Sequence, residues 1–406
     1  MGIYRLCFFA LFSEIMNTIA MFRHFWIICG FISSTISSYA AIDIIFDYSY
    51  DTGNYFGDEQ RYIMEQVAYV FESRITSGFT STRPEDIAGA TGVTANLYFK
   101  NPTTQATVQP VIGAGSLTDD GNEIGKEDEL IIFLGARNSG FSSSNVLASA
   151  SATSSYVSSY SSSAGRDAWN ARKNSKDTAS VFQPVAGSSQ VNSSKSFYFD
   201  TDLTTHTDAE VSGKTDFYTV MVHEVGHIMG FNTHNAWNAN LSGSNWIGTE
   251  AMKEYSLLNP PNGEAVPLYS STNPHWSLGL DYNKTNCGCH PSMLPSVSSN
   301  KRTTFSDLDF ALLKDIGYSI SDNPTGTNIG GTYSPARGGT YDIPVSMSYN
   351  DWLSLPGNGG NGSGGFVSPA SAAPEPAYIF TILGGFVALL GSRKHLNKFK
   401  SFFKIV

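Results

Sequence analysis

Residues 215–229 read TDFYTVMVHEVGHIM, and this stretch decides which fold the chain can adopt. Its apolar residues recur at the spacing of a largely buried helix, and Gly230 follows where a left-handed residue commonly ends a helix. His223 and His227 stand four positions apart, so they lie on one face of that helix. The stretch therefore predicts a buried helix that presents two imidazoles side by side.

The pattern His-Glu-x-x-His formed by residues 223–227 indicates a metal site. Both imidazoles can bind one ion, while Glu224 lies beside the open coordination position. Nitrogen ligands in an exported protein point to zinc. Zinc lowers the pKa of a water molecule and polarises a peptide carbonyl, and Glu224 can act as general base and then as proton donor to the leaving amine. The alternative is that His223 and His227 are core histidines that bond to the backbone.

The longer string from His223 to Gly230, His-Glu-x-x-His-x-x-Gly, resembles the metzincin family of zinc peptidases. In that family a third histidine follows three residues after the glycine. Here that position is Thr233, and His234 lies one residue later. The third ligand that a zinc site requires must therefore be sought elsewhere in the chain as well.

Three later segments resemble the leishmanolysin-like branch of the metzincins, in which an insertion separates the glycine from the third histidine. They are Pro274-His275-Trp276, Ser292-Met293-Leu294-Pro295 and residues 305–318, FSDLDFALLKDIGY. By this resemblance, His275 is the third zinc ligand. Met293 is the residue of the Met-turn, which forms an apolar floor beneath the zinc.

Other third ligands remain open at this point. His234, His290 and a thiolate of Cys287 or Cys289 are the alternatives to His275. Cys287 and Cys289 can instead close a small disulfide loop that braces the Met-turn, because residues two apart can reach disulfide distance.

The resemblance implies an α+β fold of the zincin type over residues 41–320. We expect a twisted, mixed but mostly parallel sheet, two long helices of which the second is the active-site helix, and an irregular C-terminal part with the Met-turn and a last helix. Substrate would lie in the cleft between these parts. The expected strands are 42–48, 95–100, 129–134 and 196–199, and the other expected helices are 58–75 and 305–317, the latter capped by Ser306.

Two segments have compositions that predict little packed structure. Residues 139–163 are about half serine, which predicts a flexible insertion without a catalytic role. Residues 321–373 are rich in Gly, Ser and Pro and predict a spacer with one small hairpin.

The N-terminal end reads as an export signal. Arg23 and His24 precede the apolar run 25–32, and Ser38-Tyr39-Ala40 supplies a small-x-small cleavage site. Residues 1–40 are therefore expected to be a signal peptide. Its three-part pattern begins at Met21, so the first twenty residues are either a mis-assigned start or an unusually long n-region. A buried N-terminal helix or an uncleaved anchor is the alternative.

Residues 374–406 contain Pro374-Glu375-Pro376, the short apolar stretch 378–391 and a basic cluster that begins at Arg393. This order resembles the PEP-CTERM sorting tail of Gram-negative bacteria, with its short transmembrane helix. The resemblance implies recognition by an exosortase, transient anchoring in the inner membrane, and a final place on the cell surface or outside the cell. An ordinary membrane anchor is the alternative.

Charge restricts the partners. The formal net charge is −10, so the surface repels phosphate backbones and a nucleic-acid partner is not expected. The acidic residues Asp119, Asp120, Glu123 and 127–129 suggest either a calcium site made of oxygen ligands or a solvated turn, and they lack the spacing of an EF-hand.

Together these features predict an exported zinc endopeptidase that acts on proteins or peptides, with His223, His227 and His275 as ligands and Glu224 as general base. Two alternatives stay open. One is a non-catalytic surface or biofilm-matrix protein that a metal ion stabilises, and the other is a zinc hydrolase that acts on a non-peptide bond.

Overall fold

The computed structural model describes residues 42–113, 115–118, 120–203, 213–258, 264–278, 280, 291–297, 302–321 and 346–354. All of these residues belong to one compact unit. The expected signal peptide and sorting tail lie outside the described residues, as do Cys287, Cys289 and His290. Within the described ranges, no helix is both long enough and apolar enough to cross a membrane.

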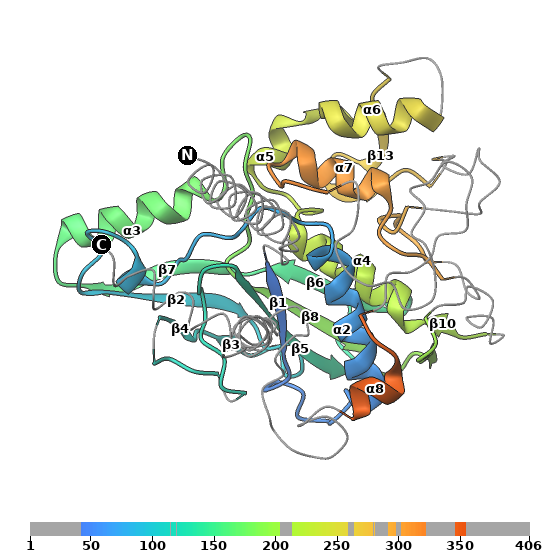
Figure 1. Ribbon diagram of the computed structural model, residues 1–406, viewed down its shortest axis with the longest axis horizontal. Helices are drawn as coiled ribbons and strands as arrows, with labels where there is room; N and C mark the ends of the chain where they lie inside the picture. The colour runs from blue at the N-terminus through green and yellow to red at the C-terminus, as the bar shows by residue number, and fades with distance from the viewer. Residues whose placement is uncertain are drawn as a thin grey trace, which may run out of the picture. The chain divides into compact units, whose positions relative to one another are not determined.

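The described residues form a mixed α+β fold, as the sequence predicted (Figure 1). Its central sheet has the strand order β1 (Asp43–Asp47), β5 (Glu129–Arg137), β8 (Gly187–Asn192) and β6 (Ala148–Ala152). β1, β5 and β8 are parallel, and β6 pairs antiparallel with β8. The expectation of a mostly parallel sheet is therefore confirmed.

Alternate residues of β5 pack into two different cores, because successive side chains of a strand point to opposite faces. Leu130, Ile132 and Leu134 belong to the larger core, whereas Ile131 and Phe133 belong to the smaller one. Such burial on both faces explains why the sequence of β5 is almost continuously apolar.

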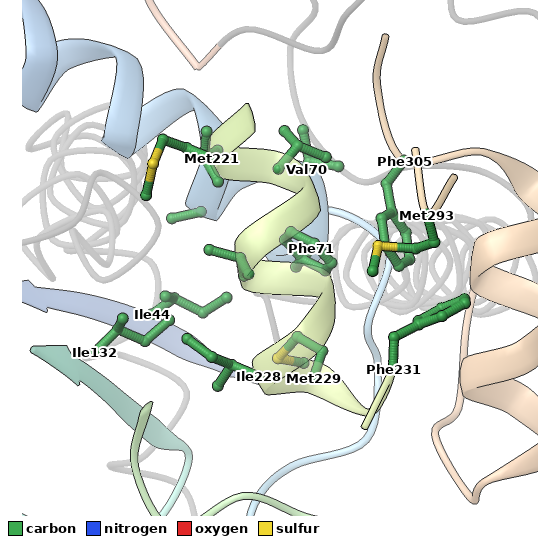
Figure 2. Packing of buried hydrophobic residues seen from close by; sticks show 14 of the residues in the cluster. Ile44, Val70, Phe71, Ile132, Met221, Ile228, Met229, Phe231, Met293 and Phe305 are labelled. Atoms are coloured by element: carbon green, nitrogen blue, oxygen red, sulfur yellow. The ribbon is translucent and has the colours of Figure 1, made fainter. Parts of the chain in front are cut away.

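The larger core lies between the central sheet and the helices α2 (Asp58–Glu72) and α4 (Phe217–Met229), which contact each other. Figure 2 shows Ile44 and Ile132 of the sheet beside Ile228 of α4, and Val70 and Phe71 of α2 near the same helix. Both long helices were expected, although α2 ends three residues before the expected boundary. Their packing fixes α4 against the sheet.

The smaller core lies under a second sheet, in which β2 (Val93–Lys100) pairs with β3 (Thr107–Val108), β4 (Val111–Ile112) and β7 (Ser154–Tyr160). Helix α3 (Ser163–Ser175) packs on these strands through the fully buried Trp169. The indole nitrogen of Trp169 donates a hydrogen bond to the carbonyl oxygen of Thr82 at 2.9 Å.

The prediction that residues 139–163 form a flexible insertion is wrong. This stretch contains β6 and β7 and ends where α3 begins. Ala148, Ala150 and Ala152 alternate with serines in β6, and the alanines pack against the larger core. The backbone of β6 bonds to β8, so a strand of small residues is held in place without large apolar side chains.

The part of the chain after α4 has its own sheet. β11 (Leu241–Ser242), β12 (Asn245–Trp246), β13 (Val266–Ser270) and β14 (Asn273–Trp276) form it in sequence order. Helices α5 (Asn235–Ala239), α6 (Thr249–Leu258) and α7 (Asp307–Asp315) also belong to this part of the chain or follow it, and α6 packs on α7 and contacts β13 (Figure 1). The Ser306 cap of α7 is confirmed, because its side chain accepts a hydrogen bond from the backbone N–H of Asp309.

Short elements complete the described part of the chain. They are the 3₁₀ turn Pro84–Asp86 and the parallel pair β9 (Phe197–Tyr198) and β10 (Thr215–Asp216). The strand expected at 196–199 is therefore present but shorter.

Part of the expected spacer is packed structure. Residues 346–354 contain α8 (Tyr349–Leu353) rather than a hairpin, and Trp352 is only 2% exposed. The hydroxyl of Tyr62 in α2 donates to the carbonyl oxygen of Met347 at 2.8 Å. This segment is thus attached to the same core as the residues before position 320.

Candidate metal centre

Helix α4 carries two of the predicted ligands at a fixed spacing. Its first turn is capped by Asp216, whose carboxylate accepts the backbone N–H of Thr219 at 3.0 Å. Gly230 ends the helix with a φ of 150°, and a Cβ at this position would lie 2.2 Å from Ile316. Between these two ends, the Nε2 atoms of His223 and His227 lie 3.0 Å apart.

His275 completes the group from strand β14. Its Nε2 atom lies 3.1 Å from that of His223, and the ligand atoms of all three histidines lie within 4.8 Å of one another. Of the His, Cys, Asp and Glu side chains in the described ranges, these three form the one group of three or more that could share a metal ion. The structure therefore brings together the three residues that the sequence analysis put forward.

The second ring nitrogen of each histidine faces an oxygen atom. The Nδ1 contacts are His223 with the carbonyl of Ser292 at 2.7 Å, His227 with the carbonyl of Phe231 at 2.6 Å, and His275 with the side-chain oxygen of Asn273. Because carbonyl oxygens only accept hydrogen bonds, each Nδ1 atom carries the hydrogen. Each Nε2 atom of a neutral ring then presents a lone pair.

Three lone pairs that converge repel one another unless a cation lies among them. Around a tetrahedral zinc ion with Zn–N bonds of about 2.0–2.1 Å, two ligand nitrogens are about 3.3 Å apart. The distances of 3.0 and 3.1 Å between Nε2 atoms are close to that value. The donor set therefore fits zinc, and the Nδ1 acceptors are the partners that hold metal-binding imidazoles in orientation.

Burial keeps these histidines neutral. It lowers the pKa of His223, partly opposed by the hydrogen bond to Ser292, and lowers the pKa of His275 to about 3, with His223 adding to the effect. The pKa of His227 falls well below its usual value, first through burial and then through His223 and His275. Neutral imidazole is the form that binds metal.

Glu224 lies next to His223 in α4 and is only 5% exposed. Its Oε2 atom is buried and has no hydrogen-bond partner in the structure. Burial raises the pKa of Glu224 to about 8, although the backbone N–H of Ala150 in β6 opposes this shift. A buried carboxylate oxygen without a partner is a group that awaits a proton or a cation.

Met293, the residue expected in the Met-turn, packs against α4 beside Gly226, which precedes His227. A Cβ on Gly226 would lie 2.5 Å from its sulfur and 2.8 Å from the ring of Phe305. Figure 2 shows Met293 and Phe305 beside each other, next to α4. The glycine before His227 thus lets α4 approach the 291–297 turn closely.

His234 occupies a different place in the fold. Its Nδ1 atom accepts the backbone N–H of Trp237 at 3.1 Å, and its Nε2 atom contacts the carbonyl oxygen of Gly230 at 3.0 Å. Its ring stacks on Phe182. Both nitrogens are therefore engaged, and His234 is not available as a metal ligand in this structure. The alternatives His290, Cys287 and Cys289 lie outside the described residues.

A cleft of about 1030 Å³ opens at the histidines. Glu224 and the three histidines contribute to its lining, as do Ala148, Ser149 and Ala150 of β6, Lys195, and residues 294–297 after Met293. β6 is the last strand of the central sheet, and its residues 148–150 line this cleft. The serine-rich stretch that was expected to have no role at the site forms one wall of it.

Three of the suggested calcium ligands have other partners. Glu123 forms an ion pair with Arg83 at 2.7 Å, and Lys126 pairs with Glu129. Asp120 accepts the backbone N–H of Tyr48 at 2.6 Å. Asp119 lies outside the described residues.

Three contacts of the histidine rings were not predicted from the sequence. The histidine rings are oriented by Asn273 and by the backbone carbonyls of Ser292 and Phe231. A residue of any type can supply a backbone carbonyl, so the sequence does not reveal such a contact. Asn273 stands two positions before His275, and this proximity was the only available hint.

No protein family matches the chain, and no curated protein or solved structure resembles it at a significant level.

Proposed function

We propose that this chain is an exported zinc endopeptidase of the metzincin type. One observation carries the proposal: three histidine lone pairs converge next to the unpartnered carboxylate oxygen of Glu224 in the lining of an open cleft. A structural zinc site has four protein ligands and no opening. Three nitrogen ligands with an adjacent carboxylate correspond instead to a site that leaves one position for reactants.

Zinc in this site would supply a Lewis acid that acidifies water and polarises a substrate carbonyl. Glu224 would take a proton from the attacking water and return it to the leaving amine. The backbone N–H of Ala150 fixes the carboxylate on one side, which leaves Oε2 for the proton.

The shape of the cleft supports an extended polypeptide as substrate. β6 is an edge strand whose residues line the cleft, so its free edge would offer backbone groups that can pair with a further strand. The β6 residues that line the cleft are alanine and serine, which leave room for substrate side chains. These features favour peptide bonds over other hydrolysable bonds.

The test is cleavage of a fluorescently labelled unfolded protein by the purified, zinc-loaded full chain. A zinc chelator should abolish cleavage, and zinc should restore it. Glu224→Gln should bind zinc with unchanged stoichiometry but lose at least about 100-fold in rate, because it removes the general base. Glu59→Gln, at an exposed position of α2, is the matched control.

Full activity in Glu224→Gln would overturn the proposed mechanism. If the folded, zinc-loaded wild type cleaves no protein, the alternative of a non-catalytic surface or biofilm-matrix protein is favoured. If it cleaves a non-peptide ester but no protein, the alternative of a zinc hydrolase that acts on a non-peptide bond is favoured.

Export remains part of the proposal and rests on the sequence of residues 1–40 and 374–406. An exosortase-type machinery would recognise the tail, and the membrane would hold it transiently. Replacement of Pro374, Glu375 and Pro376 by alanine should leave the protein in the membrane fraction, and unchanged release would contradict the sorting role.

A further inference from the structure

Asp309, in the first turn of α7, is a fully buried carboxylate. Its Oδ1 atom accepts the indole N–H of Trp276 at 2.7 Å. Its Oδ2 atom accepts the backbone N–H of Ser292 at 2.9 Å, together with the backbone N–H and the hydroxyl of Ser306 at 2.8 and 2.7 Å. All its partners donate, so the side chain acts purely as an acceptor.

Two of these hydrogen bonds lead directly to metal ligands. Trp276 follows His275 in β14, so its indole fixes the strand that supplies the third ligand. The backbone N–H of Ser292 donates to the other oxygen of Asp309, while the carbonyl of Ser292 accepts Nδ1–H of His223. A further backbone bond, from Trp276 N–H to the carbonyl of Met293 at 2.9 Å, joins the same two segments.

We propose that Asp309 is a positioning residue for the candidate zinc site, an inference that rests on the proposed function. One carboxylate holds the β14 strand with one oxygen and the 291–297 turn with the other. It thereby sets the distance between His275 and the carbonyl that orients His223. Loss of either bond lets the third ligand move relative to α4, and zinc affinity falls.

A purely structural role for Asp309 predicts something different. Asp309 also belongs to the capping box of α7, so its removal would weaken that helix in any case. Ser306→Ala removes the cap hydroxyl but leaves the bonds to Trp276 and Ser292. If Asp309 only caps α7, Ser306→Ala and Asp309→Asn should weaken zinc binding equally. If Asp309 positions the ligands, only Asp309→Asn should weaken it.

Asp315 offers a matched control at the other end of α7. Its carboxylate also accepts an indole N–H, that of Trp246 at 2.9 Å, and two backbone N–H groups, those of Glu250 and Ala251 at 2.7 and 3.0 Å. These bonds hold α6 and contact none of the three histidines. Asp315→Asn therefore removes a carboxylate that accepts the same kinds of hydrogen bond, but it changes no contact of the three histidines.

The experiment measures the zinc dissociation constant of the full chain in competition with a chromogenic chelator, with the thermal unfolding midpoint recorded in parallel. Asp309→Asn should raise the dissociation constant about 10- to 100-fold, the usual effect of removing a group that orients ligands. Asp315→Asn and Ser306→Ala should lower the unfolding midpoint while the dissociation constant stays within about threefold of wild type. The visible spectrum of the Co²⁺-loaded protein should change in Asp309→Asn alone.

Equal zinc affinity in Asp309→Asn and wild type would overturn this inference and leave the proposed function intact. Failure of the wild type to bind zinc would overturn both. If Asp309→Asn does not fold, Trp276→Phe takes its place, because it keeps an aromatic ring at this buried position and removes the N–H that joins β14 to Asp309, although the smaller ring also leaves a cavity. Unchanged affinity in that variant would likewise overturn the inference.

Discussion

The sulfur of Met293 fills the space that a side chain on Gly226 would need. A Cβ at position 226 would lie 2.5 Å from that sulfur, far closer than two such atoms can approach. Helix α4 therefore rests on the 291–297 turn through bare backbone. This contact sets the distance across which the Ser292 carbonyl reaches His223.

Gly226→Ala should separate α4 from the turn. We expect a loss of about 1–3 kcal/mol in the free energy of unfolding, as for other overpacked cores, and weaker zinc binding because the Ser292 contact lengthens. Denaturant unfolding and zinc competition measure the two effects. Gly53→Ala is the control, because a Cβ there has no atom within 4 Å. If Gly226→Ala and Gly53→Ala have the same free energy of unfolding and the same zinc affinity, the 291–297 turn can move away from α4 without loss of stability.

Replacement of single histidines distinguishes ligands from structural residues. His275→Ala should weaken zinc binding by at least about 100-fold, more than the loss of an orienting group. His234→Ala should keep zinc binding but lose about 1–2 kcal/mol of stability, because His234 caps α5 and stacks on Phe182. Zinc titration of both variants, with unfolding curves, gives the comparison. Normal zinc affinity in His275→Ala would move the third ligand to another residue.

Stability should fall as pH rises because of Glu65. Burial raises its pKa to about 8, with Asp43 adding to the shift, whereas the unfolded value is near 4.5. Between these values the unfolded chain is ionised and the folded chain keeps the proton, so the contribution of this group is complete below pH 4.5 and is lost by pH 8. The slope it adds is at most about 1.4 kcal/mol per pH unit.

Glu65→Gln removes this titration. Relative to wild type, the variant should therefore gain stability steadily from pH 5 to pH 8, as measured by denaturant unfolding. Glu59→Gln, at an exposed position of the same helix, is the control. Parallel curves for wild type and Glu65→Gln would mean that Glu65 ionises in the folded protein as readily as in the unfolded chain.

Trp352→Ala should destabilise the whole domain. The indole is nearly fully buried and its ring centroid lies 6.0 Å from that of Tyr62 in α2, so truncation should cost about 3–5 kcal/mol. Urea unfolding of Trp352→Ala and of the exposed Asn350→Ala provides the test. If both variants unfold like wild type, α8 is not part of the cooperative unit.

Local patterns predicted the helices α4 and α7, which lie at and near the candidate metal centre. The apolar spacing before Gly230 and the four-residue interval between His223 and His227 were sufficient for α4. Ser306 likewise marked the start of α7. These signals lie within a few residues of one another, so no knowledge of tertiary packing was needed.

The wall of the cleft formed by β6 was missed because composition was averaged over the stretch. Half serine suggested disorder, yet Ala148, Ala150 and Ala152 alternate with serine at the period of a strand. Asp309 was missed for a different reason. Its partners Trp276 and Ser292 are distant in sequence, and only the folded chain brings their N–H groups together.

The separation of His223 and His275 along the chain has a consequence for how the protein is assembled. An ion bound by both would close a loop of 52 positions without a covalent bond. By the chain statistics applied to disulfides, closure of such a loop removes about 4 kcal/mol of entropy from the unfolded ensemble. If the protein binds its ion only after export, the chain would cross the membrane before this loop is closed. The entropy of the unfolded chain would then fall only on the far side of the membrane, when the ion binds His223 and His275.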